Sequence, residues 1–299
     1  MPARILRDAA RAGAVIVVVA IAMLWPGLNL ADAHAYWAVP FDDLYGAAKA
    51  GGADAYLYAP AFAQVLAPFK ALPWPVFAGL WLLFMALCLV AIAGVWAILV
   101  AFIPPVLIEL QAGNIHLPLA LAIGLGLRYP ATWAFVLLTK PTLGIGLLWF
   151  VVRREWRHLA IALGSTAAIA AVSFVIAPSA WAAWIDALIV NAGHPISPDY
   201  SGVIHVPLLM RLPLAALIVI WGAMTDRRWT VGVATTLALP ILWINGLAVL
   251  LAIPLLMDWR DPRAVIASFS ASRRGGGGPR TGRHGHELAI REEPDALRE

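Results

Sequence analysis

The chain has 299 residues, of which 62% are hydrophobic and 13% are charged, whereas an average soluble domain has roughly 25% charged residues. This composition excludes a soluble globular protein and predicts an all-α, polytopic integral membrane protein folded as a helical bundle. The formal net charge of +4 does not indicate nucleic-acid binding, because the basic residues fall in short clusters between apolar runs. The single cysteine, Cys88, excludes an intrachain disulfide and a cysteine-based metal site.

The first predicted element is an apolar run, residues 12–30, which follows three arginines and precedes Ala31-Asp32-Ala33. A positive start, an apolar run and a small-x-small site are also the pattern of a cleaved signal peptide. Because the chain stays hydrophobic downstream, we favour an uncleaved first transmembrane span, with cleavage after Ala33 as the alternative.

Further apolar blocks follow along the chain, and proline or glycine divides several of them. A membrane span needs roughly 20 apolar residues, and broken helices are tolerated where neighbouring helices satisfy the freed backbone groups. We expect about ten transmembrane segments, in the blocks 12–30, 76–93, 95–109, 115–127, 130–140, 143–152, 158–176, 206–223, 229–241 and 244–257.

The distribution of charge predicts the orientation of these spans. With the N-terminus in the cytoplasm, ten spans place the C-terminus and most arginine clusters on the cytoplasmic side, as the positive-inside rule requires. Two long loops, 31–75 and 177–205, then face outward. We expect residues 1–267 to form a single transmembrane domain, and the polar, glycine-rich residues 268–299 to form a disordered cytoplasmic tail.

The first outer loop carries the strongest candidate for acid–base chemistry. Asp32 stands where the first span meets the outer face, in the sequence Asp32-Ala-His34-Ala-Tyr36. Partial burial raises the pKa of a carboxylate and makes it a stronger base, which suits removal of a proton from a sugar hydroxyl. The alternative is an aspartate that only marks the end of the helix.

Other residues of this loop are candidate substrate contacts. Asp42-Asp43 are adjacent and therefore point apart, and capping of the helix-like stretch 44–50 is their alternative role. Tyr56 and Tyr58 offer rings that stack on a sugar or that anchor the chain at the headgroup level. The apolar stretch 61–69 is expected to form a short surface or re-entrant helix.

A polar turn between two later blocks supplies further candidates for substrate binding. Gln111 and Asn114 carry amides suited to hydroxyl groups, Gly113 permits a tight turn, and His116 follows. A plain connecting turn is the alternative.

Two cations interrupt apolar blocks. A lysine at membrane depth costs roughly 2.5–3.5 kcal/mol, so Lys140 is expected to have a partner, and a phosphate anion is an apt one. Arg211 is a candidate for a second phosphate contact, and snorkelling to the interface is the alternative role of these cations. His194 and His205, which flank the second outer loop, are candidate substrate contacts.

Metal and nucleotide cofactors are not expected. No spacing of histidine, aspartate and glutamate matches a metal-ligand motif, and no glycine-rich phosphate loop follows a predicted strand.

Taken together, the motifs resemble glycosyltransferase family 87, a polyprenyl-phosphate-mannose-dependent, mannosyltransferase-like family of the GT-C superfamily. The resemblance covers about residues 10–260. Five motifs carry it in order: Asp32-x-x-x-Tyr36; Tyr58-Ala-Pro60-Ala-Phe62 with Pro68 and Leu72-Pro73; Leu110-Gln111-Ala-Gly-Asn114; Lys140-Pro141-Thr142; and Arg153-Arg154-x-Trp156-Arg157.

This resemblance implies a helical membrane fold with its site on the extracytoplasmic face of a bacterial-type plasma (inner) membrane. It implies transfer of a sugar, typically mannose, from a polyprenyl-phosphate donor to a lipid or glycan acceptor, with no nucleotide-sugar. By position, Asp32 matches the general base of the family, and Lys140 matches its lysine near the donor phosphate.

Two other classes of function stay open from the sequence. A lipid flippase or transporter would use Lys140 and Arg211 as an anion path, but transporters often carry inverted repeats. The chain shows no repeat, and its polar residues gather on one predicted face, which favours the enzyme. A structural subunit whose site has decayed is the third class.

The uncleaved first span gives a direct test. We predict that the mature protein, by N-terminal sequencing, starts before residue 31, because the apolar run 12–30 is expected to remain as the first span. A mature chain that starts at His34 would contradict this prediction and would remove Asp32 from the enzyme.

Overall fold

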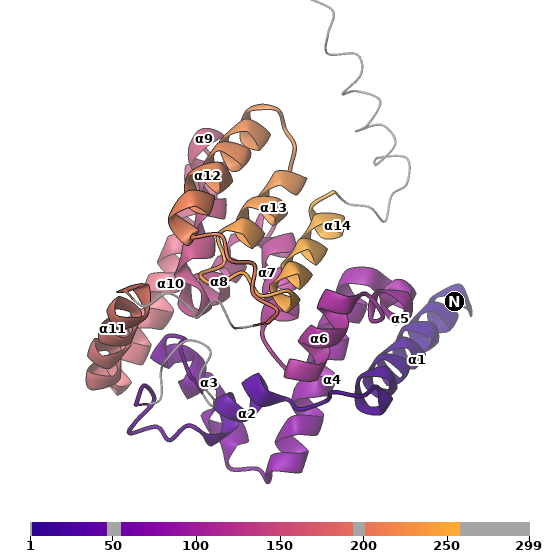
Figure 1. The fold of residues 1–299 in the computed structure, drawn as a ribbon. Coiled ribbons are helices and arrows are strands. Elements are labelled where there is room, and N and C mark those ends of the chain that lie inside the picture. Colours follow the sequence, from indigo (N-terminus) through magenta and orange to yellow (C-terminus); the bar gives the residue numbers. More distant parts are fainter. Residues whose placement is uncertain (1, 47–54, 194–200, 258–299) are drawn as a thin grey trace, which may run out of the picture. The chain divides into compact units, whose positions relative to one another are not determined.

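The computed structural model describes residues 2–46, 55–193 and 201–257, which belong to one compact unit, Met1–Arg260. Its regular elements are helices (Figure 1), and Val203 and Trp243 form an isolated antiparallel bridge. The α-helices are α1 (Pro2–Leu24), α2 (Ala31–Ala38), α3 (Pro60–Lys70), α4 (Trp74–Ala93), α5 (Ala97–Val100), α6 (Pro104–Ala112), α7 (His116–Gly126), α8 (Trp133–Thr139), α9 (Leu148–Val152), α10 (Trp156–Ile176), α11 (Pro178–Gly193), α12 (Leu208–Met224), α13 (Trp229–Leu237) and α14 (Ala252–Leu256). The 3-10 helices are η1 (Gly94–Trp96), η2 (Pro130–Thr132), η3 (Pro141–Leu147) and η4 (Asn245–Leu251).

The all-helical membrane character is confirmed, whereas the number of spans stays a prediction. Two helices among the described residues are long and apolar enough to cross a membrane, Trp74–Val100 and Trp156–Ile176. A third span results if α6 and α7, which are bent by 115° at a short break, are counted as one. Most of the first apolar block lies in the 23-residue helix α1, and the other remaining blocks form shorter helices.

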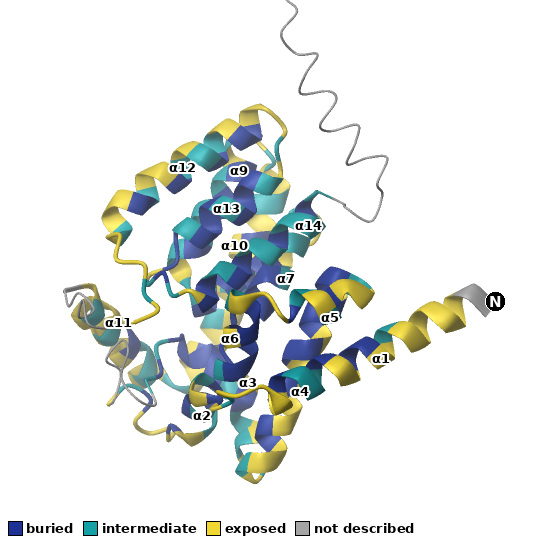
Figure 2. Cartoon of the chain, turned by 45° about the vertical axis from the view of Figure 1, so that its right-hand side comes forward, coloured by how far each residue is buried: buried dark blue, intermediate teal, exposed yellow. Residues whose placement is uncertain are grey.

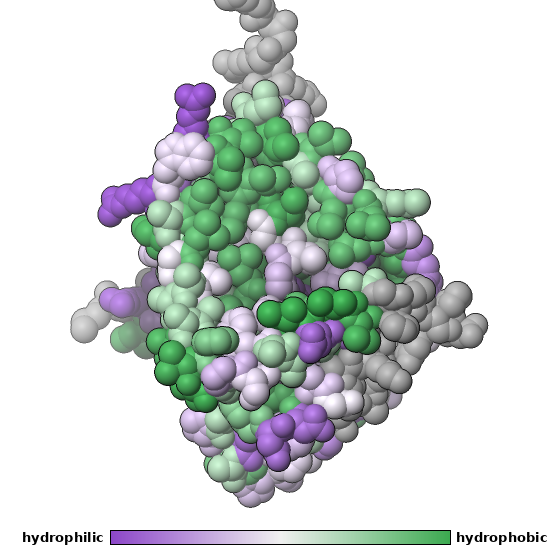
Figure 3. Space-filling view, turned by 90° about the vertical axis from the view of Figure 1, so that its left-hand side faces the viewer, coloured by the Kyte–Doolittle hydropathy of each residue, from purple (hydrophilic) through white to green (hydrophobic). Residues whose placement is uncertain are grey.

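Much of the exposed surface of these helices is apolar. Large side chains such as Val175 on α10 and Leu209 on α12 are 79% and 83% exposed, and Figure 2 shows long exposed stretches on α1 and α12. The face drawn in Figure 3 carries a broad hydrophobic area. Exposed apolar surface on this scale marks contact with lipid or protein, as expected for an integral membrane protein.

Both predicted outer loops contain helices. Segment 31–75 holds α2 and α3, and α3 confirms the expected short helix at 61–69. Segment 177–205 holds the 16-residue helix α11, because its alanine-rich sequence favours helix. The predicted tail, 268–299, lies outside the described residues.

Proline and glycine place the breaks that matter for the site. α8 ends at Thr139 because Pro141 disfavours helical backbone at the preceding residue, and Lys140 accordingly has φ −136° and ψ 84°. Gly113 ends α6 in the left-handed conformation, with φ 70° and ψ 29°. The polar residues Lys140 and Asn114 therefore lie at interruptions between apolar helices.

Arg211 has a structural role that the sequence did not reveal. Its side chain is buried on α12, and its guanidinium donates to four backbone carbonyl oxygens: Val206 (2.8 Å), Leu237 (2.5 Å), Leu239 (2.8 Å) and Pro240 (3.2 Å). These carbonyls follow α13 and precede α12, so the guanidinium joins the two helices. Because four of its five N–H donors are occupied, this arginine is not placed to bind a donor phosphate.

We predict that Arg211→Lys destabilises the protein. An ammonium has three donors, and each buried carbonyl left without a partner costs about 1–3 kcal/mol. The melting temperature in detergent should fall by about 5 °C or more, whereas Arg228→Lys, at an exposed arginine before α13, should leave it within about 1 °C. Equal melting temperatures for the two variants would contradict the structural role.

Candidate active site

Asp32 lies in the first turn of the short helix α2. A carboxylate is favoured at this position because the N-terminal end of a helix carries partial positive charge. The side chain is partly buried, and Tyr36 follows four residues later, on the same face of the helix. The predicted motif Asp32-x-x-x-Tyr36 is thus one surface of one helical turn.

The turn between α6 and α7 brings Asn114 to Asp32. Asn114 Nδ2 donates to Asp32 Oδ2 at 2.9 Å, and Asn114 Oδ1 accepts from the backbone N–H of Ile115 at 2.7 Å. Since a backbone N–H can only donate, the second bond fixes the orientation of the amide. No residue that the structure describes donates a hydrogen bond to Asp32 Oδ1, which leaves this oxygen for a substrate hydroxyl.

The environment of Asp32 makes it a stronger base than an exposed aspartate. Burial raises the pKa of Asp32, and the negative charge of Glu109 raises it further. The hydrogen bond from Asn114 and the charges of His116 and Lys140 act in the opposite direction. The net shift of the pKa is upward, so Asp32 accepts a proton more readily than an exposed aspartate does.

Gly113 lets α2 approach this turn closely. Besides its positive φ, an added Cβ would lie 2.8 Å from Ala33 Cβ and 3.1 Å from Leu30 Cδ2. Its carbonyl also accepts a hydrogen bond from Trp81 Nε1 at 2.7 Å. The contact of α2 with the turn therefore requires a residue without a side chain at position 113.

Gln111 joins the turn to the chain before α2. Its backbone oxygen accepts from the N–H of Leu30 at 2.8 Å, and its Nε2 donates to the carbonyls of Pro26 and Trp25 at 2.9 and 3.3 Å. The predicted role of this amide in substrate binding is thus replaced, in the structure, by a role in holding α2 in place.

Two tyrosines complete the polar side of the site. The hydroxyls of Tyr36 and Tyr58 are 3.1 Å apart, and Tyr58 makes a longer contact of 3.5 Å with Asn114 Oδ1. Burial raises the pKa of both phenols, so they remain neutral donors. Tyr56, predicted beside them, donates instead to the carbonyl of Ala59 at 3.1 Å.

Lys140 contributes the positive charge. Its Nζ lies 5.7 Å from the centre of the Tyr58 ring, in reach of a cation–π interaction, and it interacts electrostatically with Asp32. The side chain is half-buried, yet no described residue forms a hydrogen bond or ion pair with its ammonium. A half-buried cation in this state is a ready site for an anionic ligand.

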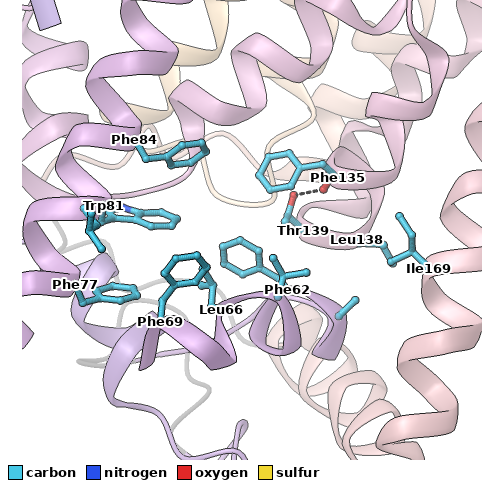
Figure 4. A pocket seen from close by; sticks show the side chains of 13 residues that line it. Phe62, Leu66, Phe69, Phe77, Trp81, Phe84, Phe135, Leu138, Thr139 and Ile169 are labelled. Carbon is cyan, nitrogen blue, oxygen red and sulfur yellow. Dashed lines mark hydrogen bonds between the residues drawn. The ribbon is translucent and has the colours of Figure 1, made fainter. Parts of the chain in front are cut away.

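An apolar cavity of about 500 Å³ opens beside this polar cluster. Aromatic side chains from α3, α4 and α8 point into it (Figure 4), and Thr139, the residue before Lys140, is part of its lining. Two of its wall residues, Phe62 and Trp81, also pack on the ring of Tyr36, with ring centres 5.5 and 5.2 Å apart. The cavity and the Asp32 cluster therefore share a wall. The cavity is lined by Ala61, Phe62, Val65, Leu66, Phe69, Phe77, Leu80, Trp81, Phe84, Phe135, Leu138, Thr139 and Ile169.

The other predicted site residues lie elsewhere or at the margin. His34 packs against Trp37 and Trp74, with ring centres 5.7 and 5.0 Å apart. Asp42-Asp43 are exposed on a turn, and His205 is exposed before α12. His194 and most of the stretch that Asp42-Asp43 were expected to cap lie outside the described residues.

Two features of the site were not predicted from the sequence. Glu109 was not a candidate, although its seven-residue separation from His116 across a turn was visible in the sequence. The aromatic lining of α4 also went unnoticed, although Phe77, Trp81 and Phe84 recur at the spacing of one helix face. In the described ranges, no group of three or more His, Cys, Asp or Glu side chains could hold a metal ion.

We predict that Gly113→Ala destabilises the protein by about 2 kcal/mol, because alanine strains the left-handed backbone and its Cβ meets Ala33. Thermal unfolding in detergent measures the loss. Gly79→Ala is the matched control on α4, where an added Cβ meets nothing within 4 Å and alanine is the better helix former. A Gly113→Ala protein as stable as this control would show that α2 does not need the close contact.

A comparison with known protein families covers part of the residues of this site and does not include Asp32 or Tyr36. The model of the family described as Glycosyltransferase family 87 matches residues 56–272, which is most of the chain. No curated protein and no solved structure matches it. The match includes Tyr58, Asn114 and Lys140, and it decides between an enzyme and the transporter or structural alternatives. The chain belongs to glycosyltransferase family 87 and is a glycosyltransferase of the membrane.

Proposed function

We propose that the protein transfers mannose from a polyprenyl-phosphate donor to a lipid or glycan acceptor, on the extracytoplasmic face of a bacterial-type plasma membrane. The single observation that carries this proposal is the position of Lys140. It combines a half-buried ammonium without a described hydrogen-bond or ion-pair partner, the neighbouring carboxylate of Asp32, and a cavity lined in part by the preceding residue.

The cavity suits the hydrocarbon part of such a donor. Its volume lies within the range of roughly 300–1,000 Å³ that is usual for ligand pockets, and all its lining side chains except Thr139 are apolar. A polyprenyl chain between α3, α4 and α8 places its phosphate near Thr139 and Lys140, where the ammonium compensates the negative charge. Arg211 takes no part in this step, because backbone carbonyls occupy its donors.

Asp32 acts as the general base in this scheme. Its Oδ1 takes the proton of an acceptor hydroxyl, whose oxygen attacks the anomeric carbon of the sugar. The bond between that carbon and the phosphate oxygen breaks, and its electron pair leaves with the polyprenyl phosphate. One displacement inverts the anomeric centre.

The leaving group carries a phosphate that Lys140 stabilises in the transition state. The step therefore requires no nucleotide and no metal ion. The buried, neutral hydroxyls of Tyr36 and Tyr58 lie beside the base and form a chain of hydrogen bonds to Asn114, which supports the amide that binds Asp32.

We predict that Asp32→Asn lowers transfer from labelled polyprenyl-phosphate mannose to a membrane lipid extract by about 100-fold or more, as expected for loss of a general base. The change keeps the shape of the side chain, so the melting temperature should stay near that of the wild type. Asp8→Asn, at an exposed aspartate of α1, serves as the control and should transfer normally.

Lys140→Met separates the roles of the two residues. Loss of the phosphate contact should raise the KM for the donor and also lower kcat, whereas Asp32→Asn should lower kcat with little change in that KM. Turnover by Asp32→Asn close to that of the wild type would reject Asp32 as the base.

A further inference from the structure

A fully buried ionisable pair lies behind the site. Glu109, in the last turn of α6, and His116, the first residue of α7, are both 0% exposed. Glu109 Oε1 accepts from the backbone N–H of His116 at 2.5 Å. Its Oε2 accepts from His116 Nδ1 at 2.8 Å and from Asn245 Nδ2, at the start of η4, at 2.9 Å.

These three hydrogen-bond donors replace the water that an exposed carboxylate would bind, and they stabilise the charge of Glu109. A buried carboxylate stays ionised only where hydrogen bonds or an opposite charge replace its hydration. His116 Nε2 is buried and has no hydrogen-bond partner among the described residues. A proton on Nε2 would leave a charged donor without an acceptor. The ring proton that faces Glu109 is therefore the one on Nδ1, which donates to the carboxylate.

Glu109 also holds the turn that faces Asp32. Its backbone oxygen accepts from the N–H of Gly113 at 3.0 Å, and its side chain accepts from the N–H of His116. Asn114 lies between these two bonds and donates to Asp32 on the other side of the turn. One glutamate thus fixes both ends of the segment that presents the amide to Asp32.

The charge of Glu109 reaches Asp32 as well. Among the groups around Asp32, Glu109 on α6 raises the pKa of the aspartate, whereas His116 on α7 and Lys140 after α8 lower it. Tyr36 on α2 and Tyr58 before α3 also interact with Asp32 and are neutral. Glu109 is therefore the one described negative charge that opposes ionisation of Asp32.

We propose that Glu109 is a positioning residue for Asp32: it holds the turn that orients Asn114, and it supplies the buried negative charge that strengthens the base. The catalytic consequence rests on the proposed function, in which Asp32 removes the proton of the acceptor. The effect of Glu109 on the ionisation of Asp32 does not rest on the proposed function, and it can be measured without a substrate.

The test is an infrared pH titration of full-length protein in lipid nanodiscs. The carboxyl band of Asp32 is isolated by subtracting the spectrum of Asp32→Asn. Glu109→Gln removes the charge and keeps the shape of the side chain, and both His116 and Asn245 can reverse their donors toward the new amide. Without the neighbouring charge Asp32 ionises more easily, so its titration midpoint should shift to lower pH than in the wild type.

Asn245→Ala is the matched control, because it removes one donor to Glu109 and keeps the carboxylate. Its Asp32 midpoint should stay closer to the wild type than that of Glu109→Gln. A Glu109→Gln midpoint equal to that of the wild type, or equal shifts in the two variants, would overturn the proposal. If Glu109→Gln does not fold, Glu109→Met takes its place, because methionine also removes the charge and fills a similar space, and the same outcomes decide. A wild-type midpoint at about 3.9, the value of a free aspartate, would also overturn the proposal.

Transfer kinetics distinguish a failure of the proposed function from a failure of the role of Glu109. In Glu109→Gln the acid limb of the transfer rate should move to lower pH, because Asp32 must be ionised to act. If Asp32→Asn transfers normally, the proposed function loses its base whatever the infrared result. If Asp32→Asn is inactive and Glu109→Gln keeps the wild-type midpoint, only the role of Glu109 falls.

Discussion

The short turn between α6 and α7 is the constraint on which the site depends. Gly113 ends α6 with a positive φ and allows α2 to lie against it, and the next residue, Asn114, binds Asp32. The same turn receives Trp81 from α4 and the buried side chain of Glu109. Helices from distant parts of the sequence therefore meet at a few backbone groups, and the position of the candidate base follows from these contacts.

Two cations in apolar surroundings illustrate how the structure separates scaffold from site. Arg211 is buried and its guanidinium is bound by four backbone carbonyls, so its charge stabilises the junction of α12 and α13. Lys140 is half-buried between α8 and η3 and contacts the face of the Tyr58 ring. Both residues break an apolar block in the sequence, but the ammonium of Lys140 donates to no described residue, whereas Arg211 has one of its five N–H donors left.

The sequence predicted the parts of the site that depend on local order. The proline after Lys140 ends α8 where expected, and the motif of Asp32 and Tyr36 was identified, although the helix α2 that carries both residues was not predicted. Contacts between distant segments could not be predicted from the sequence. The hydrogen bond from Asn245 to Glu109 spans 136 residues, and the amide of Gln111, predicted to bind substrate, donates to the carbonyl of Pro26. Hydropathy located the helices, but it did not show which of them are long enough to span a membrane, because proline and glycine divide most of the apolar blocks.

We propose that one phosphate-binding site joins the Asp32 cluster to the apolar cavity. A cryo-electron microscopy structure of the protein in nanodiscs with bound polyprenyl phosphate tests it most directly. We predict phosphate density within hydrogen-bond distance of Lys140 Nζ, with the lipid chain between Phe62 and Trp81. Phosphate density away from Lys140, with the cavity between α3, α4 and α8 empty of lipid, would contradict it.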